Sequence, residues 1–295
     1  MAKELVMAEP AYIGIVDAAK GGVGGVVFGH TKECKPTVFR YEWPPEVQAA
    51  VHTHDNPEGT ITNSDLEMAG ILMLWLVMEQ VVPSLRHEHV ALLSDNSPTV
   101  SWVQRMASKR SQVAGNLLRA LSLRMRVRRA SPLTALHIPG IHNRIADVPS
   151  RSFGYKAEWH FKCDKAFLTF FDRTFPLPKQ NSWHFFQVAK KICTRVTSAM
   201  LTTQSEAAEW RRLPKIGASS GGTGNAIAGL WEPILTLTRE RQVFEEGSEP
   251  SAGSQQEQGE DFLVGGNKSP WEQCVRHSRP LVRRSKWTRG PPQSN

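Results

Sequence analysis

Four acidic residues stand where predicted strands and helices begin or end. Asp17 and Asp95 each end a predicted strand. Glu67 and Asp147 each open a predicted helix. In an open α/β sheet, strand ends and neighbouring helix starts converge on one crevice, where carboxylates repel one another unless cations lie between them. Oxygen ligands suit Mg²⁺, with Mn²⁺ as the alternative, so the pattern predicts two metal ions that support in-line phosphodiester displacement.

Each of these carboxylates also has a local explanation. Ser64 and Glu67 have the spacing of a capping box, in which the Glu side chain reaches back to the backbone N–H of the cap. Asp17 could serve the turn that follows it, and Asp95 and Asp147 could cap helices. Only the joint pattern of all four favours a metal site over these local roles.

The elements that must position these residues follow from apolar periodicity and turn residues. Strands are expected over residues 12–16, 23–28, 36–43, 89–95 and 133–139. Helices are expected over residues 64–82, from the cap Ser97 and Pro98 onward, over 112–127 and over 146–151. The order β-β-β-α-β-α-α-β-α indicates an α/β fold, a mixed five-stranded sheet flanked by helices, in a domain spanning residues 8–154.

The rest of the chain has a different composition. Residues 155–216 are aromatic-rich and broken by prolines, and we expect a mostly helical extension there. Residues 217–295 are rich in Gly, Ser, Gln and Glu and end in a basic arm, which predicts a disordered tail.

The cysteines and the apolar runs bear on where the protein works. The cysteines are scattered without CxxC spacing, so we expect reduced thiols in an intracellular protein, nuclear or cytoplasmic rather than secreted. The longest apolar run, residues 68–78, is shorter than the ~20 residues that cross a bilayer. No membrane partner is expected.

A basic segment lies between the last two carboxylates of the pattern. The chain carries a net charge of +8, and no Asp or Glu occurs between Asp95 and Asp147. Solvated surfaces normally mix charges of both signs, whereas a single-sign segment beside a carboxylate cleft suits a phosphate backbone. The predicted basic contacts to nucleic acid are Arg105, Lys109, Arg110, Arg119 and Arg144.

Four strings resemble the ribonuclease H family over residues 11–153. "VDAAKGGVGGVVF" is similar to its first hairpin, "NSDLEMAG" to the start of its metal-binding helix, and "SDNSPTVSW" to its strand-end Asp. "HIPGIHNRIADVPSR" is the most specific string and resembles the retrotransposon form, which ends Asn-x-x-Ala-Asp-x-x-Ser-Arg. The resemblance implies a ribonuclease H-like fold in which Asp17, Glu67, Asp95 and Asp147 bind two Mg²⁺ ions.

The resemblance also implies roles for neighbouring residues and a substrate. His137 matches a loop histidine that assists proton transfer or product release, with His142 as its rival. Asn143 matches a loop asparagine, and Asn143 and Asn96 join the expected nucleic-acid contacts. The implied reaction is cleavage of the RNA strand of RNA–DNA hybrids, and a separate reverse transcriptase is a further candidate partner.

Related enzymes fit less well. A transposase would need a late Glu within the acid-free segment, and a proofreading-type exonuclease would carry Asp-x-Glu where this chain has Asp17-Ala18-Ala19. The segment after residue 154 is similar to retrotransposons of the tyrosine-recombinase (DIRS) group, so we expect a piece of a retroelement polyprotein that lacks the polymerase and recombinase. Two alternatives stay open: a catalytically silent relic that binds nucleic acid or a partner protein, and an adaptor that acts through its basic tail.

Overall fold

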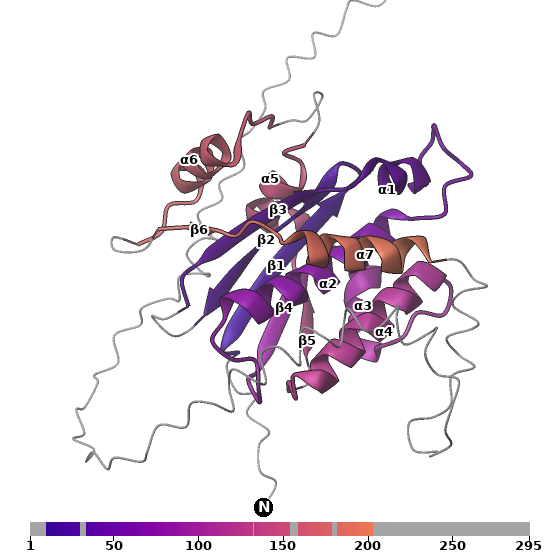
Figure 1. Cartoon of the computed structure of the whole chain (residues 1–295), viewed down its shortest axis with the longest axis horizontal. Coiled ribbons are helices and arrows are strands. Elements are labelled where there is room, and N and C mark those ends of the chain that lie inside the picture. The colour runs from indigo at the N-terminus through magenta and orange to yellow at the C-terminus, as the bar shows by residue number, and fades with distance from the viewer. Residues whose placement is uncertain (1–9, 30–33, 132, 154–158, 179–181, 203–295) are drawn as a thin grey trace, which may run out of the picture.

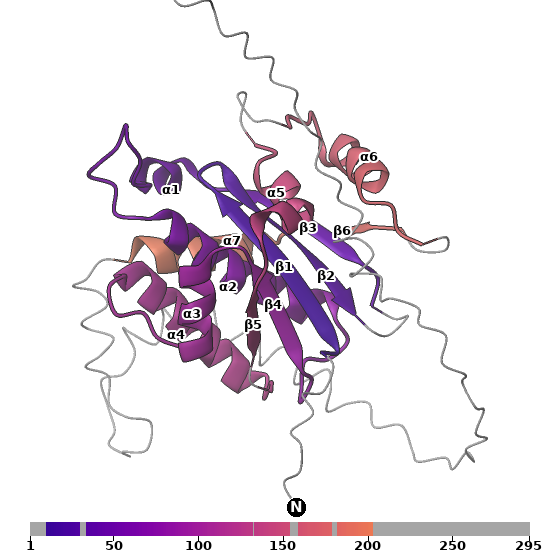
Figure 2. The same ribbon diagram turned by 180° about the vertical axis from the view of Figure 1, so that it is seen from behind.

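One mixed sheet organises the protein, whose computed structural model describes residues 10–29, 34–131, 133–153, 159–178 and 182–202 (Figures 1 and 2). The strands of these residues are β1 Tyr12–Ala19, β2 Gly22–Gly29, β3 Thr37–Glu42, β4 Val90–Ser94, β5 Thr134–His137 and β6 His184–Phe185. They are ordered β5-β4-β1-β2-β3-β6. β1, β2 and β3 pair antiparallel, whereas β4 runs parallel to both β1 and β5, and β6 runs parallel to β3.

Helices cover both faces of this sheet (Figures 1 and 2). They are α1 Pro45–Ala50, α2 Asn63–Val81, α3 Ser97–Arg105, α4 Gln112–Val127, α5 Arg144–Ser150, α6 Asp164–Thr174 and α7 Lys190–Leu201, with a 3-10 turn, η1 Gly140–His142. Residues of α2, α4 and α7 share one hydrophobic cluster, and residues of α5 and α6 share a second cluster on the opposite face. None of the described helices combines the length and apolarity that a membrane span requires.

The predicted fold class is confirmed, with two corrections. The sheet is mixed and flanked by helices, and the predicted elements occur in the predicted order, but the six-residue α1 lies between β3 and α2, where no helix was predicted. The sheet has six strands in the described part of the chain rather than five, because the two-residue β6 from the extension pairs with β3. The division of the chain at residue 154 stays a prediction, and the expected tail, 217–295, lies outside the described residues.

The alternation of β1 decides which face each of its side chains joins. Val16 and Ala18 belong to the cluster under α2, and Ile13 and Ile15 belong to the cluster under α5 and α6. Asp17 has the same parity as Ile13 and Ile15, so its side chain leaves β1 on the α5 side. A carboxylate at the end of a buried strand is thereby turned toward the last helix of the predicted domain.

The start of α2 corrects the predicted capping box. Thr62 is the N-cap, its backbone N–H donates to Asp65 Oδ2 at 2.9 Å, and its Oγ1 accepts from the Asp65 N–H at 3.3 Å. The predicted pair Ser64 and Glu67 therefore does not form the box. Because Asp65 satisfies the helix end, the Glu67 carboxylate is available for other contacts.

Close packing fixes α5 against β2. A Cβ atom on Gly24 of β2 would lie 2.5 Å from both Pro149 Cβ and the Ser150 nitrogen. Any larger residue would push α5 away from the sheet. Gly24 thus allows the helix that carries Asp147 to lie directly against β2.

Aromatic side chains of the extension close the second face. Phe167 and Phe171 of α6 are buried, and Trp183 packs on Phe28 of β2 with ring centroids 5.5 Å apart. Arg40 of β3 lies over the Phe167 ring at 4.6 Å and donates to Asp164. These contacts attach the extension to the sheet through both apolar area and one charged anchor.

A buried ion pair joins α2 to α4 on the face of the sheet that these two helices cover. Glu79 of α2 accepts from Arg124 of α4, from Arg128 Nε at 3.3 Å and from Trp75 Nε1 at 2.8 Å. Glu79 and Arg124 are 4% and 1% exposed, so neither charge is solvated by bulk water. Loss of one partner leaves the other charge buried without its counter-charge.

We expect Glu79→Gln to lower the free energy of unfolding by about 3–5 kcal/mol, because the Arg124 guanidinium loses its buried counter-charge. Urea denaturation measures the change. The exposed Glu58→Gln is the matched control and should shift stability by less than about 0.5 kcal/mol. Equal effects of the two substitutions would contradict the assignment.

Candidate metal centre

Three of the four predicted carboxylates meet at one point. Asp17 lies in β1, Glu67 lies in the second turn of α2, and Asp95 follows β4. One ligand oxygen from each lies within 4.8 Å of those of the other two. Because β1 and β4 are parallel neighbours, their carboxyl ends reach the same edge of the sheet, which brings Asp17 beside Asp95.

These carboxylates line a cleft of about 370 Å³. Asp17 and Glu67 are each 3% exposed, and Asp95 is half-buried. Lys20 and Arg151 also line the cleft. The cleft is open enough to admit a small polar group, while two of its acids are almost fully removed from water.

Hydrogen bonds hold the two buried carboxylates in place. Ser150 Oγ donates to Asp17 Oδ2, and Asn143 Nδ2 donates to Asp17 Oδ1 at 3.4 Å. Ser94 Oγ donates to Glu67 Oε2 at 3.4 Å, and the Ala18 backbone N–H also donates to Glu67. The donors come from β1, β4, α5 and the residue that precedes α5, so the carboxylate positions depend on the whole edge of the sheet.

Burial and mutual repulsion shift the titration of these acids. Burial, opposed by the Ser150 hydrogen bond and reinforced by the charge of Asp147, raises the pKa of Asp17 from 3.8 to about 6. Burial, followed by the charges of Asp17 and Asp95, raises the pKa of Glu67 well above its usual range. The site is therefore costly to ionise unless a positive charge enters it.

The donor set fits a hard divalent cation. The clustered ligand atoms are all carboxylate oxygens, which suit Mg²⁺ and Mn²⁺, and contain no thiol or imidazole. Their 4.8 Å limit is close to the roughly 4.2 Å that separates oxygens on opposite sides of one Mg²⁺. Asp17, Glu67 and Asp95 could therefore share a cation with small side-chain movements.

The fourth predicted ligand lies beside this cluster but is engaged elsewhere. In the described residues the cluster has three members, and Asp147 is not among them. Its carboxylate pairs with Arg151 Nε, one helical turn further along the chain. Asp147 is nevertheless near enough to raise the pKa of Asp17 by its charge.

The predicted loop histidine lies next to Asp95. His137 is exposed at the end of β5, and its Nε2 lies 3.0 Å from the Asp95 carbonyl oxygen. Because a carbonyl only accepts, the neutral ring carries its proton on Nε2 and leaves Nδ1 as an acceptor. His142 is exposed in η1. In the same turn, a Cβ on Gly140 would lie 3.0 Å from Asp95 Oδ2, so glycine leaves that oxygen uncovered.

The predicted nucleic-acid contacts divide by exposure. Arg105, Lys109 and Arg110 are exposed at the end of α3 and in the connection to α4, whereas Arg119 is half-buried in α4. Arg124, which belongs to the same acid-free segment, is buried against Glu79 and does not add to the basic surface.

Two asparagines and one further arginine complete the predicted set. Asn96 is the N-cap of α3, accepts from the Thr99 N–H at 3.0 Å and lines the cleft. Arg144 is half-buried at the start of α5. Asn143 is fully buried and donates to Val16 O and to Asp17, so in this structure it positions the carboxylate, and its contact with nucleic acid stays a prediction.

Comparisons with known proteins add one similarity. A scan against models of protein families and a search of curated proteins each found no match. A search of solved structures returned a chain described as LC11-RNase H1 in complex with an RNA/DNA hybrid. The alignment covers 47% of this chain and 92% of that chain, at 15% sequence identity and a TM-score of 0.31. At these values the similarity carries no activity over to this chain.

Several cleft residues were not among the predicted site residues. Lys20, Asn63 and Arg151 line the cleft, and Ser94 and Ser150 bind its carboxylates. For the residues around α5, the signal was already in the quoted string, whose final Ser-Arg dipeptide is 150–151. Ser94 lies directly before Asp95, but nothing in its sequence context points toward Glu67.

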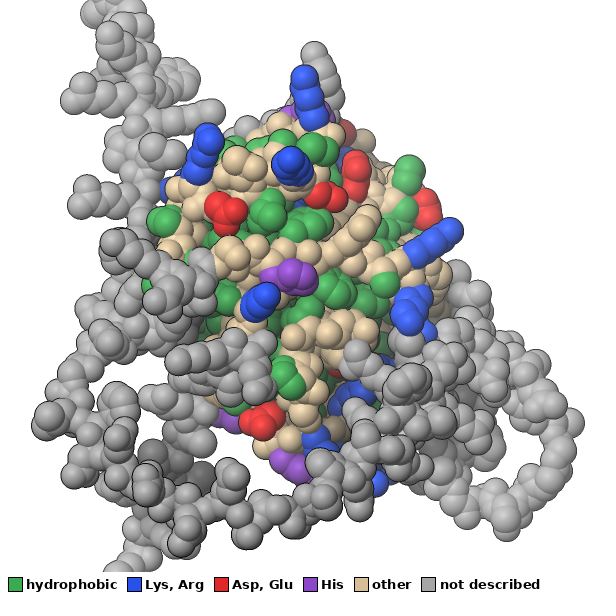
Figure 3. Space-filling model, turned by 60° about the vertical axis from the view of Figure 1, so that its left-hand side comes forward, with side chains coloured by type: hydrophobic (Ala, Val, Ile, Leu, Met, Phe, Trp, Pro, Cys, Tyr) green, Lys and Arg blue, Asp and Glu red, His purple; other side chains and the backbone are tan. Residues whose placement is uncertain are grey.

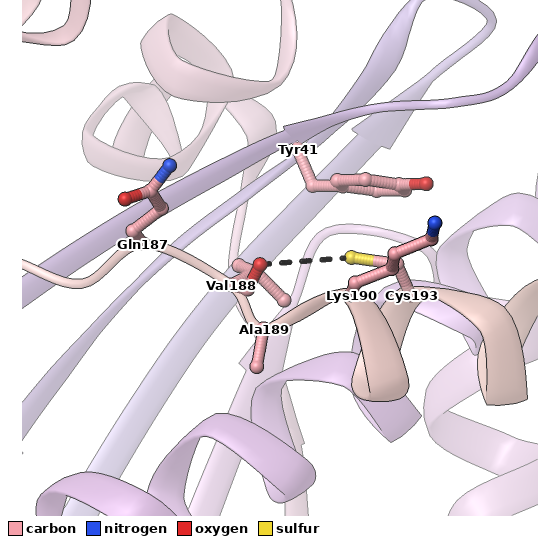
Figure 4. Close-up of a pocket in the computed structure, with 6 residues that line it drawn as sticks. All are labelled: Tyr41, Gln187, Val188, Ala189, Lys190 and Cys193. Carbon is pink, nitrogen blue, oxygen red and sulfur yellow. Dashed lines mark hydrogen bonds between the residues drawn. The ribbon is translucent and has the colours of Figure 1, made fainter.

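A second cavity, of about 440 Å³, lies between β3 and α7 (Figure 4). Tyr41 stands opposite Cys193, whose Sγ donates to Val188 O at 3.9 Å. Burial raises the pKa of the Cys193 thiol and that of Tyr41, the latter to about 12. Both groups are neutral at pH 7, so Cys193 is not an activated nucleophile.

The outer surface on the α6 side mixes side chains of all kinds. Basic and acidic groups are interspersed among apolar ones on this face (Figure 3). Such a surface is ordinary for a folded protein and lacks the single-sign character expected of a face that binds a polyanion. The exposed basic residues at the end of α3 are better placed for that role.

The raised pKa of Asp17 predicts a pH-dependent stability. The folded protein holds this proton more tightly than the unfolded chain, so the contribution is complete below about pH 4 and is lost as the pH rises through about 6. We expect Asp17→Asn to be more stable than the parent by about 2–3 kcal/mol above pH 7, at about 1.4 kcal/mol per pKa unit. Urea denaturation from pH 4 to pH 8 in a chelator tests this, and a gap that does not change with pH would contradict it.

A divalent cation should stabilise the folded protein by relieving the same repulsion. At about 100 times its dissociation constant, Mn²⁺ should add about 2.7 kcal/mol to the free energy of unfolding. Thermal denaturation with Mn²⁺ and then with excess chelator measures this gain. The gain should be largely lost in Glu67→Gln and retained in the exposed Asp172→Asn, and an equal gain in both variants would place the cation elsewhere.

Proposed function

We propose that the protein is a metal-dependent endonuclease that cleaves the RNA strand of RNA–DNA hybrids. The observation that carries this proposal is the convergence of Asp17, Glu67 and Asp95 in one cleft, with two of them desolvated. Carboxylates held at such cost are more useful for binding a cation than for stability. Divalent cations bound there would polarise the phosphate and lower the pKa of the attacking water.

The protein's own groups would orient and transfer protons in this reaction. Hydrolysis joins a water oxygen to phosphorus and breaks the P–O3′ bond, which leaves a 3′-hydroxyl and a 5′-phosphate. The departing O3′ must gain a proton and the water must lose one. His137 would accept on its Nδ1 the proton that the water loses, because its Nε2 is occupied by the Asp95 carbonyl oxygen.

The exposed basic residues would hold the substrate beyond the cleft. α3 follows its N-cap, the cleft residue Asn96, and ends at Arg105, so its nine residues separate the two sites by about 13 Å. This distance corresponds to about four base pairs along a duplex. Lys109 and Arg110 extend the same positive surface, and recognition would follow duplex shape and 2′-hydroxyls rather than base sequence.

The origin of the chain is also a proposal. The string that ends in Asp147, Ser150 and Arg151 is similar to the retrotransposon form, which supports descent from a retroelement polyprotein. In that setting a separate reverse transcriptase would supply the hybrid. The ions would be two Mg²⁺, or Mn²⁺, and an intracellular location follows from the expected reduced thiols.

A labelled hybrid tests the proposed activity. With Mg²⁺ or Mn²⁺, we expect the parent to cut the RNA strand of the hybrid and to leave double-stranded DNA intact. Asp95→Asn should reduce the rate on the order of a hundredfold or more, because a charge that holds the cation is lost. Gel analysis of labelled ends measures both the rate and the end chemistry.

The matched control is Asp172→Asn, an exposed carboxylate on α6 that should leave cleavage unchanged. Cation-dependent cutting that Asp95→Asn does not affect would reject the site. A folded parent that binds the hybrid without cutting it would support the silent relic instead.

A further inference from the structure

The arginine that follows α5 engages the one predicted ligand that stays outside the carboxylate cluster. Arg151 Nε donates to Asp147 Oδ1 across one helical turn, in an i,i+4 arrangement. The two side chains are 50% and 26% exposed, so both can move within solvent. Arg151 also lines the cleft with Asp17 and Asp95.

The helix beneath this pair, α5, is packed closely against the sheet and hydrogen-bonded to it, whereas the two side chains reach solvent. Ser150 Oγ donates to Asp17 and to the Asp147 carbonyl oxygen, the latter at 2.9 Å. α5 lies so close to β2 that a Cβ on Gly24 would be 2.5 Å from Pro149 Cβ, so α5 has no room to move nearer the sheet. A change in the Asp147 partner therefore requires only rotation about side-chain bonds.

Both members of the pair act on the cleft by their charge. Asp147 raises the pKa of Asp17, whereas Arg151 lowers it. A carboxylate and a guanidinium that are both felt by the same buried acid lie within electrostatic range of any cation bound there. The guanidinium thus supplies, from a tethered side chain, part of the positive charge that a divalent cation would supply.

We propose that Arg151 is a built-in counter-ion that competes with a divalent cation for Asp147. This inference rests on the proposed metal centre and concerns how that centre is loaded. A cation at Asp17, Glu67 and Asp95 can bind without disturbing the pair, whereas a cation that uses Asp147 must displace the guanidinium. Arg151 would therefore weaken the second binding event more than the first, and is a positioning residue rather than a catalytic one.

Cation binding without nucleic acid tests this competition. Titration calorimetry with Mn²⁺ should show tighter binding of the second ion to Arg151→Gln than to the parent, by roughly two- to fivefold, the range expected for a partly exposed ion pair. The affinity for the first ion should change less. Arg151→Lys keeps the charge and should lie between the two.

Two variants separate the ion pair from a general charge effect. Lys20→Gln removes a positive charge from the same cleft without touching Asp147, and should alter the second affinity less than Arg151→Gln does. In an Asp147→Asn background, Arg151→Gln should have no further effect on the second ion. Equal effects of Lys20→Gln and Arg151→Gln, or unchanged affinity in Arg151→Gln, would overturn the proposal.

Failure of the proposed function gives a different result. If the parent binds Mn²⁺ and Arg151→Gln raises the affinity for the second ion, but no hybrid is cut, the counter-ion role of Arg151 is supported and the nuclease proposal is wrong. If the hybrid is cut and Arg151→Gln leaves the affinities for both ions unchanged, only the proposed counter-ion role of Arg151 is contradicted. If the parent binds no Mn²⁺, both proposals are overturned.

Discussion

The repulsion among desolvated carboxylates is the constraint around which this protein is arranged. Asp17 and Glu67 are almost fully buried, and Asp95 completes a cluster within 4.8 Å. A protein gains no stability from such a cluster, because burial and like charge both disfavour ionisation. At the edge where β1 and β4 end, such a cluster could hold a cation.

Neighbouring elements take over the tasks that these acids would otherwise serve. Asp65, not Glu67, completes the cap of α2 with Thr62. Asn143 and Ser150 fix Asp17 from the α5 side. Structural roles are thereby assigned to one set of polar groups, and the clustered carboxylates are left to face the cleft.

The convergence of the carboxylates could be predicted because it depends on regular patterns. Alternating residues in β1 and the continuous apolar run of β4 identify strand ends, and parallel neighbours end at the same edge. The cap could not be placed, because Thr62–Asp65 and Ser64–Glu67 both have capping spacing and only tertiary burial distinguishes them. The burial of Asn143 depends on α5 packing on β2, which no local pattern encodes.

The sixth strand and the attachment of the extension escaped prediction for a related reason. Aromatic side chains in residues 155–216 indicate burial, but their irregular spacing does not say against which surface. In the structure, Phe167 and Trp183 lie on the face opposite α2, where they extend the cluster of β1 and β2. The short β6 follows from this docking rather than from its own two residues.

A direct measurement of the carboxyl titrations tests whether this repulsion exists and whether a cation relieves it. Carbon-detected NMR of labelled Asp and Glu side chains would follow Asp17 and Glu67 with and without Mg²⁺. We expect the pKa of Asp17 near 6 and that of Glu67 well above its usual range in a chelator, with both falling when Mg²⁺ is added. Ordinary pKa values for both residues that do not respond to Mg²⁺ would contradict the metal centre.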